Sequence, residues 1–99
     1  PEKVYNAIRG GLAGSTVLDA KVPMILEGNF NPGFKIDLHI KDLRNALATA
    51  GQCGSSAEIS ARVLEMMESL AEKGEGQNDH GGLVRYYEQS AECEIRREA

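Results

Sequence analysis

The densest group of residues that could do chemistry lies in residues 34–42, where an aromatic ring, a lysine and carboxylates occur together. Phe34 and Lys41 are seven positions apart, so in a helix of about 100° per residue their side chains point in nearly the same direction. Asp37 lies one turn before Lys41, and Asp42 flanks it. A lysine can offer a positive donor to a ligand carbonyl, amide or phosphate, and an aromatic ring can pack on a planar ring. The pattern is that of a ligand-contacting helix rather than of a catalytic centre.

The same residues also fit a solvated helix face. Asp37 and Lys41 are four positions apart, and such a pair stabilises a helix by only about 0.2–0.5 kcal/mol. Periodicity taken alone favours this second interpretation. Catalytic and metal-binding patterns are missing elsewhere: Cys53 and Cys93 read as free thiols in a reducing compartment, and His39 and His80 read as structural residues. The sequence therefore predicts neither catalytic residues nor metal ligands in this chain.

The group lies on a predicted central helix from Phe34 to Ala50. Pro32 and Gly33 precede this helix and Gly51 follows it, as expected at helix ends. An apolar stripe at alternating spacings of four and three predicts its buried side, formed by Ile36, Ile40, Leu43, Leu47 and Ala50. Phe30, in the turn-forming segment before the helix, is expected to fill the core.

Two shorter helices are predicted before this one. The first runs from Pro1 to Arg9, and glycines at 10, 11 and 14 form a tight connection to the next. The second runs from Val17 to about Leu26, is capped by Ser15 or Thr16, and is expected to bend or divide at Pro23.

Two further helices are predicted after the central one. Ser55 and Glu58 read as a capping box at the start of the fourth helix. Asp79 is expected to cap a last helix that ends near Ala91. The predicted buried stripe of the fourth helix consists of Ile59, Val63, Met66 or Met67, and Leu70. The fold class is therefore all-α, with five to six helices.

Length and charge limit the function classes. The 99 residues suit one small domain, which we assign to residues 1–91, with a charged tail at 92–99 that is expected to fray. The net charge of −4 and the pI of about 5.1 argue against a nucleic-acid-binding surface. No apolar run reaches the roughly 20 residues that cross a bilayer, and no signal peptide is present, so no membrane partner is expected.

Several segments together resemble one family. These are A-I-R-G-G-L-A-G-S-T-V-L at 7–18, G-N-F-N-P-G-F at 28–34, L-H-I-K-D-L at 38–43 with Ala46 and Ala50 beyond, and the G-x-x-D turn at 76–79. From about Val4 through Tyr87 the chain resembles the C-terminal domain of the β-hydroxyacid dehydrogenases, the relatives of 3-hydroxyisobutyrate dehydrogenase and 6-phosphogluconate dehydrogenase. Among these it is most similar to members that reduce 2-hydroxy-3-oxopropionate (tartronate semialdehyde). One departure is that His80, Gly81 and Gly82 follow Asp79, where many relatives have an aromatic residue and a serine.

The resemblance implies a fold of the 6-phosphogluconate dehydrogenase C-terminal type and an enzyme whose N-terminal Rossmann domain, absent from this chain, binds NAD or NADP. Carried over by position, Lys41 and Phe34 contact the cofactor, and Asp42 lines the substrate cleft. The family's catalytic lysine lies in an upstream segment that this sequence does not contain, so Lys41 is not that lysine. The 99-residue chain alone is expected to be inactive, and its opening at Pro1 reads as a piece of something longer.

The implied enzyme reduces a small 3-oxo acid to the 3-hydroxy acid, with glycerate as the expected product, in the cytoplasm and as a homo-oligomer. An alternative is a stand-alone helical protein-interaction module with no catalytic role, which would expose a large apolar patch. A third possibility is that the central helix is mainly a subunit interface, with Lys41 buried between two identical chains. The sequence leaves the choice between NAD and NADP open.

Overall fold

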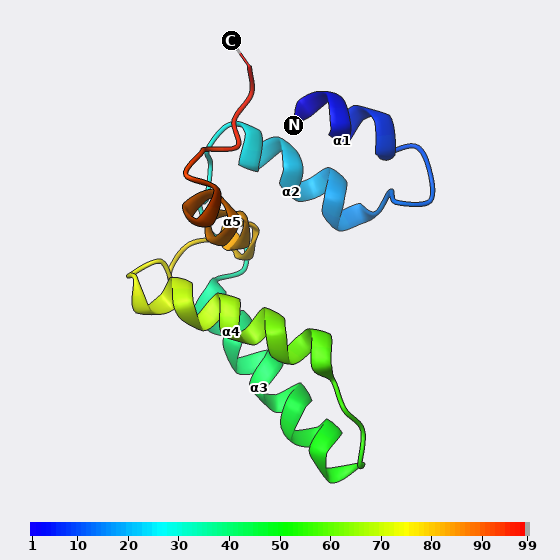
Figure 1. The fold of residues 1–99 in the computed structure, drawn as a ribbon, viewed down its shortest axis with the longest axis vertical. Helices are drawn as coiled ribbons and strands as arrows, with labels where there is room; N and C mark the ends of the chain where they lie inside the picture. The colour runs from blue at the N-terminus through cyan, green and yellow to red at the C-terminus, as the bar shows by residue number, and fades with distance from the viewer. Residues whose placement is uncertain (99) are drawn as a thin grey trace.

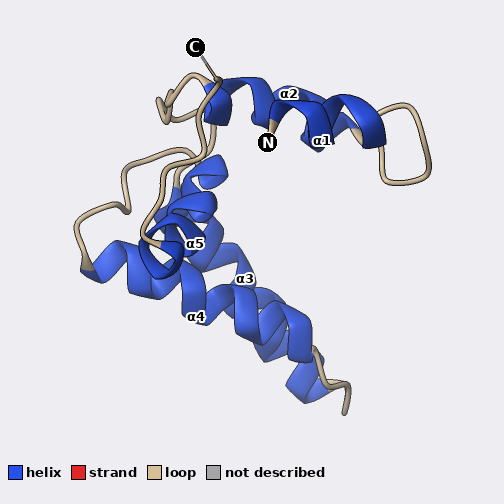
Figure 2. Cartoon of the chain, turned by 45° about the horizontal axis from the view of Figure 1, so that its top comes forward, coloured by secondary structure: helices blue, strands red, loops and turns tan. Residues whose placement is uncertain are grey.

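The chain folds into helices joined by loops, as the computed structural model of residues 1–98 shows (Figures 1 and 2). The elements are α1 (Glu2–Ile8), α2 (Thr16–Leu26), α3 (Ile36–Gln52), α4 (Glu58–Glu72), the 3₁₀ helix η1 (His80–Leu83) and α5 (Val84–Ala91). Residues 1–98 contain no strand, only an isolated antiparallel bridge between Lys35 and Asp79. The predicted all-α class is confirmed. None of these helices is long and apolar enough to cross a bilayer within residues 1–98.

The core lies where α3 and α4 pack side by side, with α5 against their upper end (Figure 1). Its buried side chains are Ile36, Ile40, Met67 and Leu70. The predicted stripe of α3 is confirmed, because Ile36 and Ile40 are buried and the rest of the stripe is half-buried. The pair α1 and α2 lies at the other end of the molecule (Figures 1 and 2). The loop before α3 therefore lies between the two helix pairs.

The first three helices begin close to their predicted positions. Ser15 caps α2 as expected, since its Oγ accepts a hydrogen bond of 3.0 Å from the amide of Leu18. α2 continues through Pro23 to Leu26 as a single helix, so the predicted division is wrong. Proline removes only one intrahelical hydrogen bond, and the burial of Leu26 favours continuing the helix. α3 begins at Ile36, two residues later than predicted, because Lys35 has the extended backbone of an N-cap.

The predicted start of α4 is right at Glu58 but its cap is wrong. Ala57 occupies the N-cap position, so Ser55 cannot form the capping box. Ile59 is 83% exposed, which contradicts its predicted place in the core. It lies in the first turn of α4, beside the α3–α4 loop and at the end of the pair that α5 does not reach (Figure 1). Met66 and Met67 are both buried, as predicted for at least one of them.

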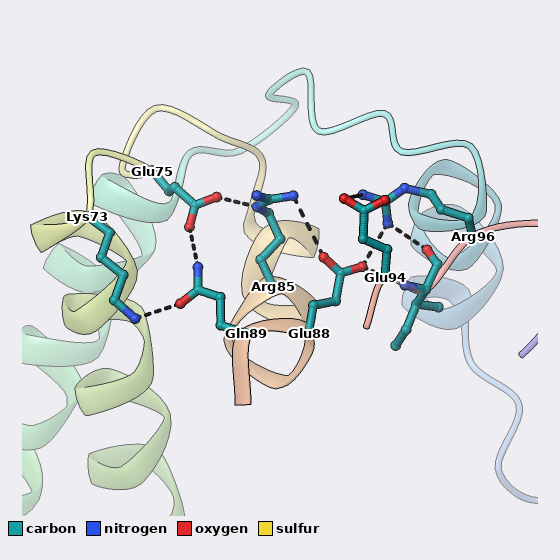
Figure 3. Close-up of polar contacts among 8 residues, drawn as sticks. Lys73, Glu75, Arg85, Glu88, Gln89, Glu94 and Arg96 are labelled. Carbon is teal, nitrogen blue, oxygen red and sulfur yellow. Dashed lines mark hydrogen bonds and ion pairs between the residues drawn. The ribbon is translucent and has the colours of Figure 1, made fainter. Parts of the chain in front are cut away.

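Polar contacts connect α4, α5 and the C-terminal segment (Figure 3). Glu88 on α5 is 6% exposed and accepts hydrogen bonds from the amide of Ile95 at 2.8 Å and from Arg96 Nη1 at 2.7 Å. The amide of Arg97 donates to the carbonyl of Leu26 at 2.8 Å, so the segment also follows the end of α2. These contacts fall in the predicted tail at 92–99, of which Ala99 lies outside the described residues.

Candidate functional site

The predicted site residues lie in two parts of the structure, the loop before α3 and α3 itself. Phe34 lies in the loop before α3, so its seven-residue spacing to Lys41 does not put both side chains on one helix face. Lys41 and Asp42 are exposed on α3, and Lys41 Nζ lies 3.3 Å from Asp42 Oδ1. Lys41 thus pairs with Asp42 rather than with Asp37, the partner in the solvated-face interpretation, and Asp37 accepts a hydrogen bond of 2.9 Å from Gln77. Lys41 and Asp42 are thus brought together, whereas Phe34 is placed by other contacts.

Phe34 belongs to an aromatic cluster with His39 and His80. Its ring meets both imidazoles edge to face, with centroid distances of 5.8 Å to His39 and 6.1 Å to His80. The two imidazoles stack with centroids 5.9 Å apart. On α3, Asp42 is three positions after His39 and faces the same side, whereas Lys41 is two positions after it and does not. The ring of Phe34 therefore lies on the side of α3 that carries His39.

Asp79 fixes the loop that carries Phe34. Its Oδ2 accepts a hydrogen bond of 2.9 Å from the amide of Gly81, so Asp79 is a cap as predicted, but of the 3₁₀ helix η1, since the last helix α5 begins only at Val84. The other oxygen, Oδ1, accepts three hydrogen bonds: from Lys21 Nζ at 3.0 Å, from the Gly33 amide at 3.0 Å and from the Phe34 amide at 3.1 Å. The side chain is 2% exposed. We call these residues, Lys21, Gly33, Phe34, Asp79 and Gly81, the Asp79 cluster.

The surroundings of Asp79 and of its neighbour His80 lower the pKa values of both groups. Burial alone would raise the pKa of Asp79, but the hydrogen bonds from Gly81, Phe34, Lys21 and Gly33 outweigh it and hold that pKa well below its usual range. Burial lowers the pKa of His80, and the charges of Lys21 and His39 add to the lowering while Asp79 opposes it. The ionised form of Asp79 and the neutral form of His80 are therefore favoured beside Phe34.

Backbone pairing completes this arrangement. The amide of His80 donates to the carbonyl of Phe34 at 2.7 Å, and the amide of Asp79 donates to the carbonyl of Phe30 at 2.9 Å. Two residues after Phe34, the amide of Ile36 donates to the carbonyl of Asn78 at 2.9 Å. Residues 30–36 and 78–80 are thus joined by three backbone hydrogen bonds around the isolated bridge between Lys35 and Asp79. Gly82 next to this pairing is buried, and a Cβ there would lie 3.5 Å from both Ile36 and Asn78.

Sequence reasoning missed part of this site. It identified Asp79 as a cap and as the end of a G-x-x-D turn, but not as the acceptor for the Phe34 loop. Lys21 carries no sequence signal, since one lysine on an amphipathic helix is ordinary. His39 and His80, read as structural, lie against the predicted cofactor residue Phe34. The signal that was available is the co-occurrence of the N-P-G-F and G-x-x-D segments.

The described residues do not form a metal site and meet only part of the requirements of a nicotinamide cofactor site. Residues 1–98 contain no cluster of three or more histidine, cysteine or acidic side chains that could hold a metal ion. Cys53 and Cys93 are free thiols, as predicted, and both are exposed. Two side chains here have chemistry that suits a nicotinamide cofactor. The half-buried ring of Phe34 can pack on a planar ring, and the exposed ammonium of Lys41 can donate to an oxygen. A strand followed by a glycine-rich turn, which would bind its diphosphate, does not occur within residues 1–98.

A second surface feature is an apolar groove of about 320 Å³ at the other end of the molecule. It lies between α1, α2, the start of α5 and the C-terminal segment, and its walls are Pro1, Val4, Tyr5, Ile8, Leu18, Val22, Ile25, Leu26, Val84 and Ile95. Val4, one of these walls, is 63% exposed. Such a continuous apolar surface is typical of a contact with another part of a protein or with another chain.

Comparisons with known proteins agree with the resemblance. A family model described as NAD-binding of NADP-dependent 3-hydroxyisobutyrate dehydrogenase matches residues 1–87. The chain is 38% identical over 88 residues to 2-hydroxy-3-oxopropionate reductase of Escherichia coli (strain K12), covering 89% of this chain and 30% of that protein. It is 37% identical over 75 residues to the oxidoreductase YkwC of Bacillus subtilis (strain 168), covering 76% of this chain and 26% of that protein.

A third relative is L-threonate dehydrogenase of Cupriavidus necator, 26% identical over 87 residues, which are 88% of this chain and 29% of that protein. The chain therefore spans 30% or less of the length of each of these three relatives. Because the family match covers nearly all of its helices, the chain belongs to the family of the NAD-binding domain of NADP-dependent 3-hydroxyisobutyrate dehydrogenase.

Proposed function

We propose that this chain is the helical domain that lines the substrate and cofactor cleft of an NAD(P)-dependent 3-hydroxyacid dehydrogenase. The family match over residues 1–87 and the 38% identity to a 2-hydroxy-3-oxopropionate reductase support this proposal. The substrate we propose is 2-hydroxy-3-oxopropionate, reduced to glycerate by a cytoplasmic homo-oligomer. A Rossmann domain would bind most of the cofactor and an upstream segment would supply the catalytic lysine, so the isolated chain is expected to have no turnover.

The observation that carries the proposal is that hydrogen bonds hold the loop of Phe34 in place before α3, on which the Lys41–Asp42 pair is exposed. Both polar main-chain groups of Phe34 are hydrogen-bonded, so its backbone is held in place before any ligand binds. Lys41 is 64% exposed and has a nearby carboxylate that can orient its ammonium group. Such a preorganised wall costs little ordering entropy when a ligand docks.

Each of these side chains has a role in this proposal. Bound nicotinamide supplies the hydride chemistry. The ring of Phe34 would pack against the planar nicotinamide ring and exclude water from the cleft. Lys41 donates hydrogen bonds to polar oxygens of the cofactor, and Asp42 lines the side where the small acid binds. None of these steps requires Lys41 to transfer a proton.

The test is Lys41→Ala in the full-length enzyme, assayed with 2-hydroxy-3-oxopropionate. We expect the KM for the cofactor to rise about 10-fold, as for loss of one charged hydrogen-bond donor. Lys73→Ala is the matched control, because Lys73 is an exposed lysine at the end of α4 that binds Gln89. Wild-type KM and kcat in Lys41→Ala would show that the assignment of Lys41 is wrong.

A second candidate function is supported by the apolar groove between α1 and α2. A helical protein-interaction module without a catalytic role would expose such a surface. The groove is also what the first proposal needs, because the domain must contact a Rossmann domain or a second subunit. The two functions differ in the kinetic outcome, since only the catalytic one gives Lys41→Ala an effect on the KM for the cofactor.

A further inference from the structure

We propose that Lys21 and Asp79 are positioning residues: the ion pair between them sets the position of Phe34, and hence of one wall of the cleft. This inference rests on the proposed function. Neither residue needs to touch the substrate or the cofactor. Their effect on the reaction would pass through the loop that ends at Phe34.

The first step of the argument is the connection of Asp79 to the loop. The amides of Gly33 and Phe34 are consecutive donors that precede α3, so they have no acceptor within a helix. Both donate to Asp79 Oδ1, at 3.0 Å and 3.1 Å. The carbonyl of Phe34 accepts from the next residue, His80, at 2.7 Å. Both the amide and the carbonyl of Phe34 are therefore hydrogen-bonded to residues 79 and 80, so a movement of those residues would move the main chain of Phe34.

The second step is the connection of Asp79 to α2. Lys21 is 58 positions away in the sequence, yet its Nζ donates to the same Oδ1 at 3.0 Å. Its side chain is only 20% exposed, and its Cδ lies 3.7 Å from where a Cβ of Gly81 would be. Lys21 is thus packed along the loop rather than extended into solvent, and its charge balances a buried carboxylate.

The third step concerns what happens without the cation. A buried carboxylate with its paired charge removed is costly and tends to move toward water or another donor. Because Asp79 Oδ1 is shared by the Lys21, Gly33 and Phe34 donors, such a movement would lengthen both loop hydrogen bonds. A displacement of about 1 Å at a residue that positions the reactants can cost up to about 100-fold in rate. Loss of Lys21 is therefore expected to appear in catalysis as well as in stability.

The test is a double-mutant cycle in the full-length enzyme, with Lys21→Met, Phe34→Ala and the double variant. Methionine keeps the length of the Lys21 stem without its charge. We expect Lys21→Met and Phe34→Ala each to lower kcat/KM by about 10-fold, and the double variant to be no worse than Phe34→Ala alone. The control is Lys73→Met, an exposed lysine away from the Asp79 cluster, which is expected to leave kcat/KM unchanged.

The outcomes separate the two proposals. Wild-type kcat/KM in Phe34→Ala would contradict the proposed function itself. A loss in Phe34→Ala without a loss in Lys21→Met would overturn only the positioning role, as would losses that multiply in the double variant. If Lys21→Met does not fold, Lys21→Gln enters the same cycle, since its amide still donates one hydrogen bond. Faster amide exchange at Gly33 and Phe34 in the folded variant, with α4 unchanged, is the expected structural readout.

Discussion

Arg96 donates a hydrogen bond of 2.7 Å from Nη1 to Glu88 Oε1, so a buried carboxylate of α5 binds the C-terminal segment of the chain (Figure 3). The guanidinium of Arg96 also lies 5.5 Å from the ring centroid of Phe30, and the guanidinium of Arg85 lies at the same distance from that ring. The α2–α3 loop, α5 and the C-terminal segment therefore meet around one aromatic ring.

Glu88→Gln is expected to lower the free energy of unfolding by about 1.5–3 kcal/mol. The substitution removes the charge that accepts from the Ile95 amide and from Arg96, and hydrogen bonds to charged groups contribute about this much. Urea unfolding followed by circular dichroism measures the change. Glu65→Gln is the control, because Glu65 pairs with Arg62 at the surface and its side chain is 65% exposed. Equal small effects in both variants would contradict a stabilising role for the buried carboxylate.

Asp79 is expected to make stability depend on pH in the acid range. Its pKa in the folded protein is below that of the unfolded chain, which is about 3.9, so the folded state releases its proton more readily. The stabilisation is therefore fully present above about pH 5 and is lost as the pH falls through 4 toward the folded pKa. The free energy of unfolding, measured in urea between about pH 5 and pH 2.5, should fall less in Asp79→Asn than in the wild type. Parallel curves would refute the assigned pKa direction.

Gly14→Ala is expected to destabilise the protein by about 1–3 kcal/mol, as overpacking does. A Cβ at Gly14 would lie 2.2 Å from the carbonyl oxygen of Arg9, a backbone atom that cannot rotate away. Gly10→Ala is the control in the same α1–α2 connection, because nothing lies within 4 Å of a Cβ there. The melting temperature of each variant measures the difference. A Gly14→Ala protein as stable as Gly10→Ala would contradict the close approach of the two backbones.

The sequence predicts the helices and the larger part of the core because periodicity and capping are local. Ile36, Ile40 and Leu70 were identified from spacing alone, and Ser15 and Asp79 from their side-chain chemistry. Ile59 was misplaced because periodicity shows which side of a helix is apolar, not how far its partner extends. The capping box predicted at Ser55 is wrong because the same four-residue pattern also occurs in loops. Here Ser55 lies in the loop, and Ala57 is the N-cap of α4.

The candidate site was predictable only in part, for a related reason. Phe34, Lys41 and Asp42 lie within nine residues of each other, and a family resemblance pointed to them. Lys21 and Asp79 meet across 58 positions, and no local pattern records such a pairing. The neighbours of Phe34 depend on a loop whose course is set by hydrogen bonds to residues 79 and 80. Tertiary contacts of that kind must be seen in a structure.

The sequence separation of the Asp79 contacts also bears on the order in which the fold is assembled. α3 and α4 are consecutive helices whose contacts close over a short loop, and such local contacts form early. The hydrogen bonds from Lys21, Gly33 and Phe34 to Asp79 join residues that are 45 to 58 positions apart. They can form only after the long intervening chain has closed into a loop, which costs conformational entropy. Loss of these bonds should accelerate unfolding more than it slows folding. The loop that carries Phe34 would then be among the last parts of the domain to form and among the first to open.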